Sequence, residues 1–271
     1  MPELPEVETT RMGIEALLAG KTVATVRVYE ERLRWPVPDH LDQLLVGRTL
    51  RALGRRGKYL LFDFDQGTLL LHLGMSGHLR VVSVGDERRK HDHVEIAFRD
   101  GSLLRFNDAR RFGALFWTDA PPENHPRLVG LGPEPLADDF DSSYLFAATR
   151  HRQVAIKPLL MNAAVVVGVG NIYASEALFR AGIDPHKPAN RLKRRETARL
   201  VAAVREVLAE AIRAGGTTIR DFADSSGKPG YFRQQLRVYG RGDQPCTVCH
   251  APIRHSRLGQ RSTWFCPVCQ T

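Results

Sequence analysis

Residues 94–106 read VEIAFRDGSLLRF, and this stretch indicates the fold of the N-terminal half. Two short β-like runs, 94–98 and 102–106, flank Asp100-Gly101, a dipeptide that favours the tight turn of a β-hairpin. Further β-like runs lie between Gly, Asp and basic clusters at 22–29, 50–55, 59–64, 68–73, 78–84 and 115–117. This spacing is typical of an antiparallel sandwich or barrel.

An N-terminal helix is expected to precede these strands, over residues 5–18. Pro5 suits the first position of a helix, where its missing N–H leaves no bond unmade. The apolar side chains that we expect to be partly buried are Val7, Met12, Ile14, Leu17 and Leu18.

The second half predicts helices instead of strands. Residues 119–141 carry six acids and five prolines and indicate an interdomain linker. Helices are expected at 158–164, 171–181 and 196–214, the last because its apolar residues recur with a period near 3.6 and it ends at Gly215-Gly216. Residues 217–230 are polar and contain glycine, so a loop is expected there.

Four cysteines occupy the C-terminal segment with the spacing C-x2-C-x16-C-x2-C, namely Cys246, Cys249, Cys266 and Cys269. Each C-x2-C pair can place two thiolates on one tetrahedral ion, so the spacing predicts one structural zinc ion in a ribbon. Two disulfides are the alternative, which a cytoplasmic location disfavours. A structural zinc site by itself does not indicate which reaction, if any, the protein catalyses.

The charge of the chain is unevenly distributed. The whole chain has a formal net charge of +9. Residues 1–144 hold 19 Lys and Arg against 22 Asp and Glu, whereas residues 145–271 hold 20 against 8. A basic excess favours a polyanionic partner, because each cation on a phosphate releases counterions, and this points mainly to the C-terminal half. A solvated basic surface is the simpler alternative.

The apolar runs are too short to span a membrane, and the N-terminus has neither the basic nor the apolar region of a secretory signal. We therefore expect a cytoplasmic protein.

Pro2 carries the first indication of chemistry. Removal of Met1 before a small second residue leaves Pro2 with a free secondary amine, and an α-amino group has a pKa of roughly 7.7–8.0. Such an amine is partly unprotonated at neutral pH. Its attack on a sugar C1′ would give a cationic iminium, which acts as an electron sink for elimination. A proline at position 2 would mean nothing without its context.

Several blocks in order resemble the formamidopyrimidine-DNA glycosylase family over almost the whole chain. They are PELPEVET at 2–9, HLGMSGH at 72–78, NDARRFG at 107–113, GVGNIYASEALF at 168–179 and QRSTWFC at 260–266. The resemblance implies an α+β fold of two domains: an N-terminal β-sandwich with an N-terminal helix, and a helical helix–two-turn–helix domain with a zinc ribbon. The corresponding segments are 2–118 (catalytic), 119–143 (linker), 144–236 (helical, with a lesion loop) and 237–271 (zinc ribbon).

The resemblance also implies an activity and its residues. The family excises oxidised purines, such as 8-oxoguanine and formamidopyrimidines, from duplex DNA and cuts the abasic strand by β,δ-elimination. Pro2 corresponds to its nucleophile, Glu3 to the general acid/base and Lys58 to the proton donor of β-elimination. Arg261 corresponds to the arginine linked to δ-elimination, but a guanidinium is a poor acid, so we expect it to clamp phosphates.

DNA contacts are implied in the same way. Excision requires the base to be flipped out of the stack, and Met75, Arg110 and Phe112 correspond to residues that fill the gap, with Arg110 facing the widowed base. Plain core positions are the alternative for Met75 and Phe112. The remaining candidates for phosphate or lesion contact are His91, Arg152, Lys157 and Asn171. Residues 217–232 resemble the family's lesion loop, and Asn162 replaces an acid found in many members.

Two other functions stay open at this point. An endonuclease VIII-like enzyme would use the same amine chemistry mainly on oxidised pyrimidines. A non-enzymatic zinc-ribbon DNA-binding protein would have no use for the Pro2 amine beside Glu3 and Lys58. We expect a monomer that acts on double-stranded DNA containing a damaged base.

Overall fold

The computed structural model describes residues 1–216 and 235–271. The chain divides into two compact units: unit 1 holds Met1–Val129 and Ala214–Arg233, and unit 2 holds Gly130–Arg213 and Gln234–Thr271. The lesion loop expected at 217–232 lies outside the described residues.

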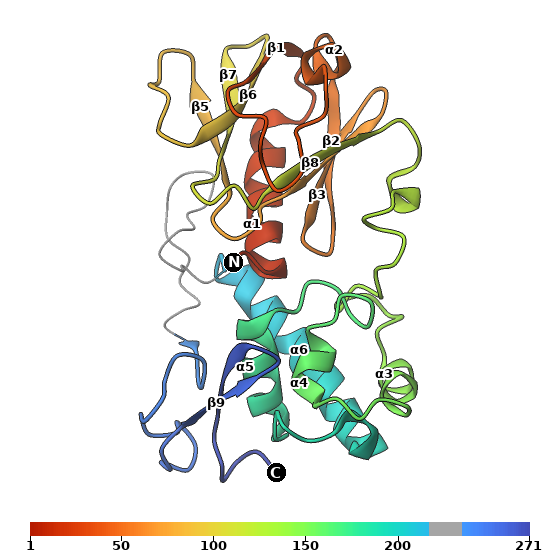
Figure 1. Ribbon diagram of the computed structural model, residues 1–271, viewed down its shortest axis with the longest axis vertical. Coiled ribbons are helices and arrows are strands. Elements are labelled where there is room, and N and C mark those ends of the chain that lie inside the picture. Colours follow the sequence, from red (N-terminus) through yellow and green to blue (C-terminus); the bar gives the residue numbers. More distant parts are fainter. Residues whose placement is uncertain (217–234) are drawn as a thin grey trace. The chain divides into compact units, whose positions relative to one another are not determined.

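Unit 1 contains two four-stranded antiparallel sheets (Figure 1). One has the order β1-β6-β7-β5 and the other β2-β3-β4-β8. The strands are β1 (Val23–Val28), β2 (Leu50–Arg56), β3 (Tyr59–Phe64), β4 (Thr68–His72), β5 (His78–Ser83), β6 (Asp92–Phe98), β7 (Ser102–Asn107) and β8 (Ala114–Thr118). Side chains from both sheets share one apolar cluster, which makes the unit the expected sandwich.

The β6–β7 hairpin confirms the prediction from Asp100-Gly101. Ile96 pairs with Leu104 across it, and the Gly101 N–H donates to the Phe98 carbonyl at 3.0 Å. Gly101 adopts a φ of 88°, a left-handed conformation that glycine tolerates without a steric penalty.

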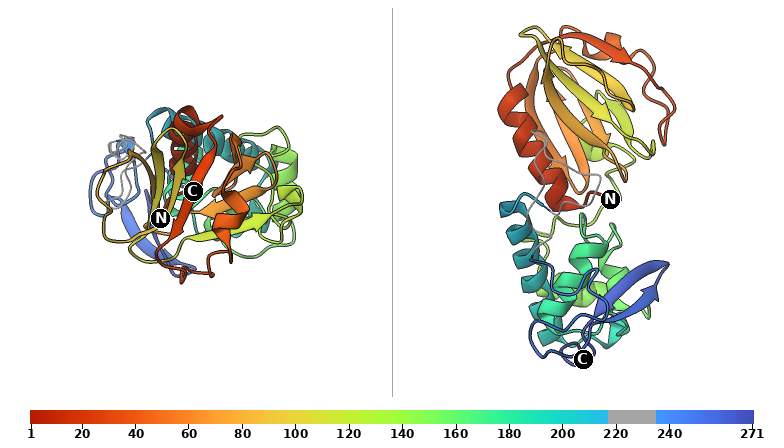
Figure 2. Two further views of the ribbon diagram at one scale, coloured as in Figure 1. Left: turned by 90° about the horizontal axis from the view of Figure 1, so that it is seen from above. Right: turned by 90° about the vertical axis from the view of Figure 1, so that its left-hand side faces the viewer.

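The N-terminal helix α1 (Leu4–Leu18) is also confirmed, and it packs on strands of both sheets (Figure 2). Leu4, Val7, Ile14 and Leu18 are buried along one helical face. The expected burial of Met12 and Leu17 is wrong, because these side chains lie off that face and are 52% and 47% exposed. A short helix α2 (Leu41–Leu45), which the sequence pattern did not reveal, packs against β1.

Unit 2 is helical, with a small two-stranded ribbon. Its α-helices are α3 (Ser142–Thr149), α4 (Ile156–Leu160), α5 (Asn171–Ala181) and α6 (Arg194–Arg213), and its strands are β9 (Arg254–Leu258) and β10 (Arg261–Phe265). Two single turns of 3-10 helix, Pro122–Asn124 in unit 1 and Ala189–Arg191 in unit 2, complete the described elements. Helix α5 has the predicted bounds and ends at Gly182, which has a φ of 66°.

Helix α4 begins and ends earlier than predicted. The Asn162 side chain accepts a hydrogen bond from the Ala164 N–H at 3.0 Å, and the Asn162 carbonyl accepts from the Val165 N–H at 2.8 Å. These bonds turn the chain at Asn162, since asparagine competes locally for the backbone groups that would continue a helix. The residue that departs from the family pattern thus lies in the turn that follows α4.

Helix α3 begins inside the segment expected to be linker. Asp141 is its N-cap and accepts from the Tyr144 N–H at 2.6 Å. An acid that we attributed to linker composition is therefore a helix-start signal. Among the described residues, no helix has both the length and the apolar character needed to cross a bilayer.

Candidate active site

Pro2 and Glu3 lie buried at the start of α1. Glu3 is the N-cap residue, and its N–H donates to the Glu6 carboxylate at 2.9 Å, while its carbonyl accepts from the Val7 N–H at 3.1 Å. The backbone beside Pro2 is therefore fixed by the first helical turn. The partial positive charge at a helix N-terminus favours the carboxylates of Glu3 and Glu6. Glu6, which sequence reasoning did not single out, could have been recognised from its capping-box spacing.

Lys58 is half-buried in the turn between β2 and β3. Burial, the Lys58 ammonium and the Arg34 guanidinium lower the pKa of His72 to about 4, so this imidazole is neutral at physiological pH. Its Nδ1 accepts from the Gly74 N–H at 3.0 Å, and its ring lies 4.8 Å from that of Tyr59. In the sequence, His72 is marked only as the first residue of the HLGMSGH block. The structure shows that it joins the Lys58 turn to the loop that carries Met75.

Met75 and Phe112 lie on adjacent loops. A Cβ built on Gly74 would fall 2.3 Å from the Phe112 carbonyl carbon, so the two backbones touch. Phe112 is 41% exposed and Met75 is half-buried, which argues against plain core roles. The exposed Arg110 guanidinium lies 4.9 Å from the centre of the Phe112 ring. The three residues predicted to fill the gap in DNA are thus together in unit 1.

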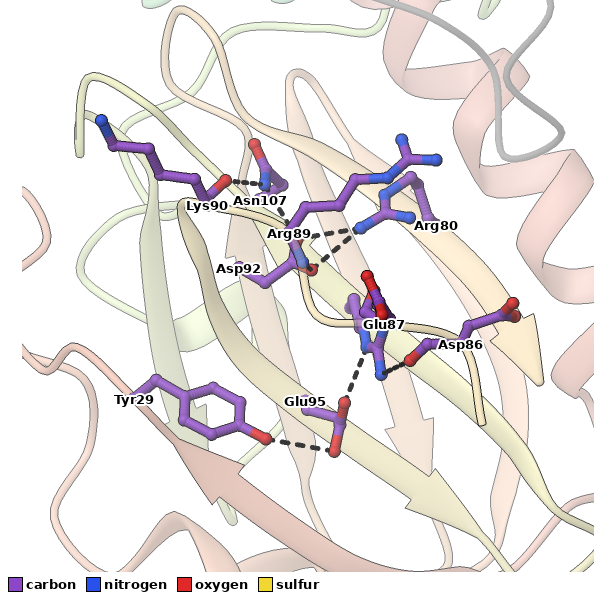
Figure 3. A network of polar contacts seen from close by, with 10 residues as sticks. Tyr29, Arg80, Asp86, Glu87, Arg89, Lys90, Asp92, Glu95 and Asn107 are labelled. Carbon is purple, nitrogen blue, oxygen red and sulfur yellow. Dashed lines mark hydrogen bonds and ion pairs between the residues drawn. The ribbon is translucent and has the colours of Figure 1, made fainter. Parts of the chain in front are cut away.

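The residues on either side of His91, Lys90 and Asp92, belong to a polar network (Figure 3). Arg80 donates to both oxygens of Asp92 at 3.0 and 2.9 Å. Asn107 donates to Asp92 at 2.8 Å and to the Lys90 carbonyl at 2.9 Å. These bonds fix the residues on either side of His91, which adopts a φ of 72° that is uncommon outside glycine.

The charged side chains in this part of the sheet form ion pairs of opposite sign, Arg80 with Asp92 and Arg105 with Glu95. Burial acts to raise the pKa of Asp92, but hydrogen bonds from Asn107, the Arg89 backbone and Arg80 outweigh it and hold this pKa below its usual value. Further along the same two strands, β6 and β7, Arg105 donates to Glu95 at 2.7 Å. Arg105 also binds the carbonyls of residues 86 and 87, both at 2.9 Å (Figure 3).

In unit 2, the side chains of Lys157 and Asn171 both donate hydrogen bonds to the Ser262 carbonyl. The Lys157 ammonium, on a residue only 1% exposed, donates to the Ser262 carbonyl at 3.0 Å and to the Thr263 hydroxyl at 2.8 Å. The Asn171 amide, at the start of α5, donates to the same Ser262 carbonyl at 3.1 Å. Both residues therefore hold the strand that begins at Arg261, whose side chain is exposed.

Arg152 belongs to a different part of unit 2. It is exposed, and its carbonyl accepts from the Asn190 N–H at 3.0 Å. The structure does not join it to the Lys157–Asn171 cluster by any hydrogen bond seen among the described residues.

Glu176 is a residue that sequence reasoning missed. It is 4% exposed on α5 and accepts from the N–H groups of Arg237, Val238 and Tyr239 at 2.8–3.0 Å. Burial raises the pKa of this carboxyl. Three converging N–H donors fix the chain where it enters the ribbon. The only available signal was an acid on an otherwise apolar helix face.

The four cysteines form a metal-binding cluster. Their sulfur atoms all lie within 4.8 Å of one another, and none is in a disulfide. Zinc–sulfur bonds of about 2.3 Å in a tetrahedron place sulfurs about 3.8 Å apart, which is close to the 3.4 Å between the Cys249 and Cys266 sulfurs and the 3.9 Å between those of Cys246 and Cys269. Four thiolates with no open position describe a structural zinc site, as predicted, and the disulfide alternative is wrong.

Family models cover nearly the whole chain. The N-terminal domain of formamidopyrimidine-DNA glycosylase matches residues 1–115, its H2TH domain matches 131–223, and the zinc finger found in FPG and IleRS matches 243–271. The chain belongs to the formamidopyrimidine-DNA glycosylase family. It is therefore a DNA-repair enzyme, a bifunctional DNA glycosylase and abasic-site lyase with a zinc finger.

Relatives and solved structures agree with this membership. The formamidopyrimidine-DNA glycosylases of Methylococcus capsulatus and Thioalkalivibrio sulfidiphilus are 56% and 57% identical over 270 residues, covering all of each chain. A point mutant of Lactococcus lactis FPG in complex with DNA containing Fapy-dG has a TM-score of 0.92 and 35% identity, with both chains covered completely. The MutM (FPG) protein from Thermus thermophilus has a TM-score of 0.89 and 39% identity, covering 99% of this chain and 98% of that one.

These findings decide between the open functions. Membership of the formamidopyrimidine-DNA glycosylase family excludes the non-enzymatic DNA-binding protein and disfavours the endonuclease VIII-like alternative. The structure of a Lactococcus lactis Fpg, which is similar to this chain, has been solved in complex with DNA containing an abasic site. DNA is therefore the binding partner of that relative.

Proposed function

We propose that this glycosylase excises oxidised purines, including 8-oxoguanine and formamidopyrimidines, from duplex DNA through a Schiff base on Pro2. The observation that carries the proposal is the position of Pro2 at the buried, hydrogen-bonded first turn of α1, with the Glu3 carboxylate next to it. The Pro2 amine, freed by removal of Met1, bonds to C1′ while the bond from C1′ to the base breaks and the base leaves with a proton. Protonation of O4′ then opens the sugar and gives the iminium.

Glu3 is the residue that we assign to these proton transfers. Its 2% exposure keeps the carboxylate out of bulk water, and its backbone is anchored by Glu6. A carboxyl group held next to the reacting amine can donate a proton to O4′ and later accept one.

Lys58 is assigned to the elimination steps. The iminium acidifies C2′, and loss of that proton expels the 3′ phosphate (β-elimination); a second elimination expels the 5′ phosphate. The neighbouring His72 is neutral, because burial and the charges of Lys58 and Arg34 oppose its protonation. We therefore assign the role of proton donor to Lys58 instead of His72, while Arg261 holds phosphate charge.

Met75, Arg110 and Phe112 are assigned to the gap that the flipped base leaves. Their adjacent loops, the exposure of Phe112 and the contact between Arg110 and the Phe112 ring support a single wedge surface. Arginine can donate hydrogen bonds to cytosine, so Arg110 would select cytosine opposite the lesion.

His91, Arg152, Lys157 and Asn171 are the remaining DNA-contact candidates. The structure supports a second role for Lys157 and Asn171, because both already hold the backbone beside Arg261. We assign residues 2–118 to the catalytic domain, 119–143 to the linker, 144–236 to the helical domain and 237–271 to the zinc ribbon. We propose that the enzyme acts as a monomer in the bacterial cytoplasm.

Borohydride trapping tests the proposal. Protein lacking Met1 is incubated with a duplex containing 8-oxoguanine opposite cytosine, reduced, digested and mapped by mass spectrometry. An adduct on Pro2 is expected, whereas an adduct on Lys58 would overturn the assignment. A parallel duplex with an oxidised pyrimidine separates the endonuclease VIII-like activity, and a preference for that duplex would contradict the proposed substrate class.

A further inference from the structure

Asp108 is a completely buried acid that directly follows β7. Its Oδ1 accepts from the Ser76 hydroxyl at 2.6 Å and from the Arg110 N–H at 3.3 Å. Its Oδ2 accepts from the Gly113 N–H at 2.7 Å. The carboxylate therefore binds both ends of the loop 110–113, which presents Arg110 and Phe112.

Ser76 connects this carboxylate to the second loop. Its hydroxyl donates to Asp108 and accepts from the Arg110 N–H at 3.1 Å. Ser76 directly follows Met75 and is 8% exposed. One hydroxyl thus links the loop that carries Met75 to the loop that carries Arg110.

Glycine packing leaves the two loops no room to shift separately. Gly74 has a φ of 64°, and a Cβ there would lie 2.3–2.5 Å from the backbone of residues 112 and 113. A Cβ on Gly113 would lie 2.4 Å from the Phe106 ring. Because no real Cβ contact is this short, the loops interlock only as long as these positions are glycine.

The backbone of Asp108 extends the arrangement to His91. Its N–H donates to the His91 carbonyl at 3.0 Å, and its carbonyl accepts from the His93 ring at 2.8 Å. Asp108 consequently has contacts on every side, from three separate segments of the chain.

We infer that Asp108 and Ser76 are positioning residues that hold Met75, Arg110 and Phe112 as one rigid wedge. The inference rests on the wedge assignment in the proposed function. Hydrogen bonds to an ionised acceptor are stronger than neutral ones, and removal of the acceptor leaves buried N–H groups unsatisfied. Without the Asp108–Ser76 pair, Arg110 and Phe112 would still be present but would no longer be aligned with Met75.

The test compares two reactions of the full-length enzyme. Excision of 8-oxoguanine from a duplex needs the wedge, because a widowed base must be held. Cleavage of an abasic site in single-stranded DNA needs Pro2 but has no widowed base. The variants are Ser76→Ala and Asp108→Asn, with Ser76→Thr as the rescue that keeps the hydroxyl. Glu95→Gln is the matched control, since it alters a buried acid on the neighbouring strand that binds Arg105 instead of the wedge.

We expect Ser76→Ala and Asp108→Asn to lower the ratio of duplex excision to single-strand cleavage about ten- to a hundredfold, the loss typical of a misplaced contact group. Discrimination between cytosine and adenine opposite the lesion should fall with it. Ser76→Thr and Glu95→Gln should keep the wild-type ratio.

Three outcomes would overturn the inference. A parallel loss of both reactions, equal to that of Glu95→Gln, would mean that the pair serves only folding. An unchanged ratio in Ser76→Ala, where Phe112→Ala lowers it, would mean that the wedge does not depend on the pair. If Phe112→Ala itself leaves the ratio unchanged, the wedge assignment of the proposed function is wrong and the inference fails with it.

Discussion

The enzyme should lose stability in mild acid because the unfolded chain binds a proton at His72 that the folded chain does not, and replacement by asparagine should remove this effect. The pKa of His72 is lowered from 6.5 to about 4 by burial and by the charges of Lys58 and Arg34. Between these two pH values the unfolded chain binds a proton that the folded chain does not, so stability is lost as the pH falls from 6.5 toward 4. At about 1.36 kcal/mol per pKa unit, the whole shift amounts to about 3 kcal/mol, and about 2 kcal/mol of it is lost by about pH 5.

Urea unfolding at about pH 7 and about pH 5 measures the difference between wild type and His72→Asn. Asparagine keeps an oxygen that can accept from the Gly74 N–H but does not titrate. The variant should therefore lose about 2 kcal/mol less than wild type over this interval. His151→Gln, at an exposed histidine, is the control and should behave like wild type. Equal losses in wild type and His72→Asn, or a His72 ring resonance that titrates near pH 6.5, would show that His72 is not held neutral by the fold.

Three further predictions concern the N-terminus, the buried lysine and the metal. An enzyme that retains Met1 should bind lesion DNA but show no strand cleavage in a gel assay, because an acylated Pro2 nitrogen is an amide that cannot form an iminium. Cleavage near the wild-type rate would exclude Pro2 as the nucleophile. Lys157→Met should lower the free energy of unfolding by about 2 kcal/mol in urea titrations, because two charge-assisted hydrogen bonds to residues 262 and 263 are lost while desolvation of the ammonium is relieved. The exposed Lys193→Met should have little effect, and equal values for the two variants would contradict the structural role of Lys157. Elemental analysis should find one zinc per chain. Chelation should unfold the ribbon, as monitored by Trp264 fluorescence, before unit 1 unfolds. A chain that loses its metal without any change in the ribbon would contradict a structural role for the zinc.

Elements with a strong local signal were predictable from the sequence. The β6–β7 hairpin follows from one turn dipeptide between two apolar runs, and α5 from its start at Asn171 and its stop at Gly182. The zinc site follows from cysteine spacing, since two C-x2-C pairs need only be brought together. Helix α3 was missed because its N-cap, Asp141, lies among prolines and acids that are equally typical of a linker.

What depends on contacts between distant residues could not be predicted. Ser76 meets Asp108 across 32 residues, and Lys157 meets Ser262 across 105. Neither pair has a spacing that marks it, since the sheet order β1-β6-β7-β5 and the packing of the ribbon on α5 decide which loops become neighbours.

The chemical groups available to this enzyme are therefore visible in its amino-acid order: a prolyl amine beside a glutamate, four thiolates for zinc and a basic C-terminal half. Which side chains are held in place, and by which partners, depends on how the chain folds. The tertiary structure turned Lys157 into a buried anchor, made His72 a neutral imidazole and joined two loops through Asp108. These properties depend on the fold because burial and hydrogen-bond partners, which set the energy of a polar group, come from residues far apart in the chain.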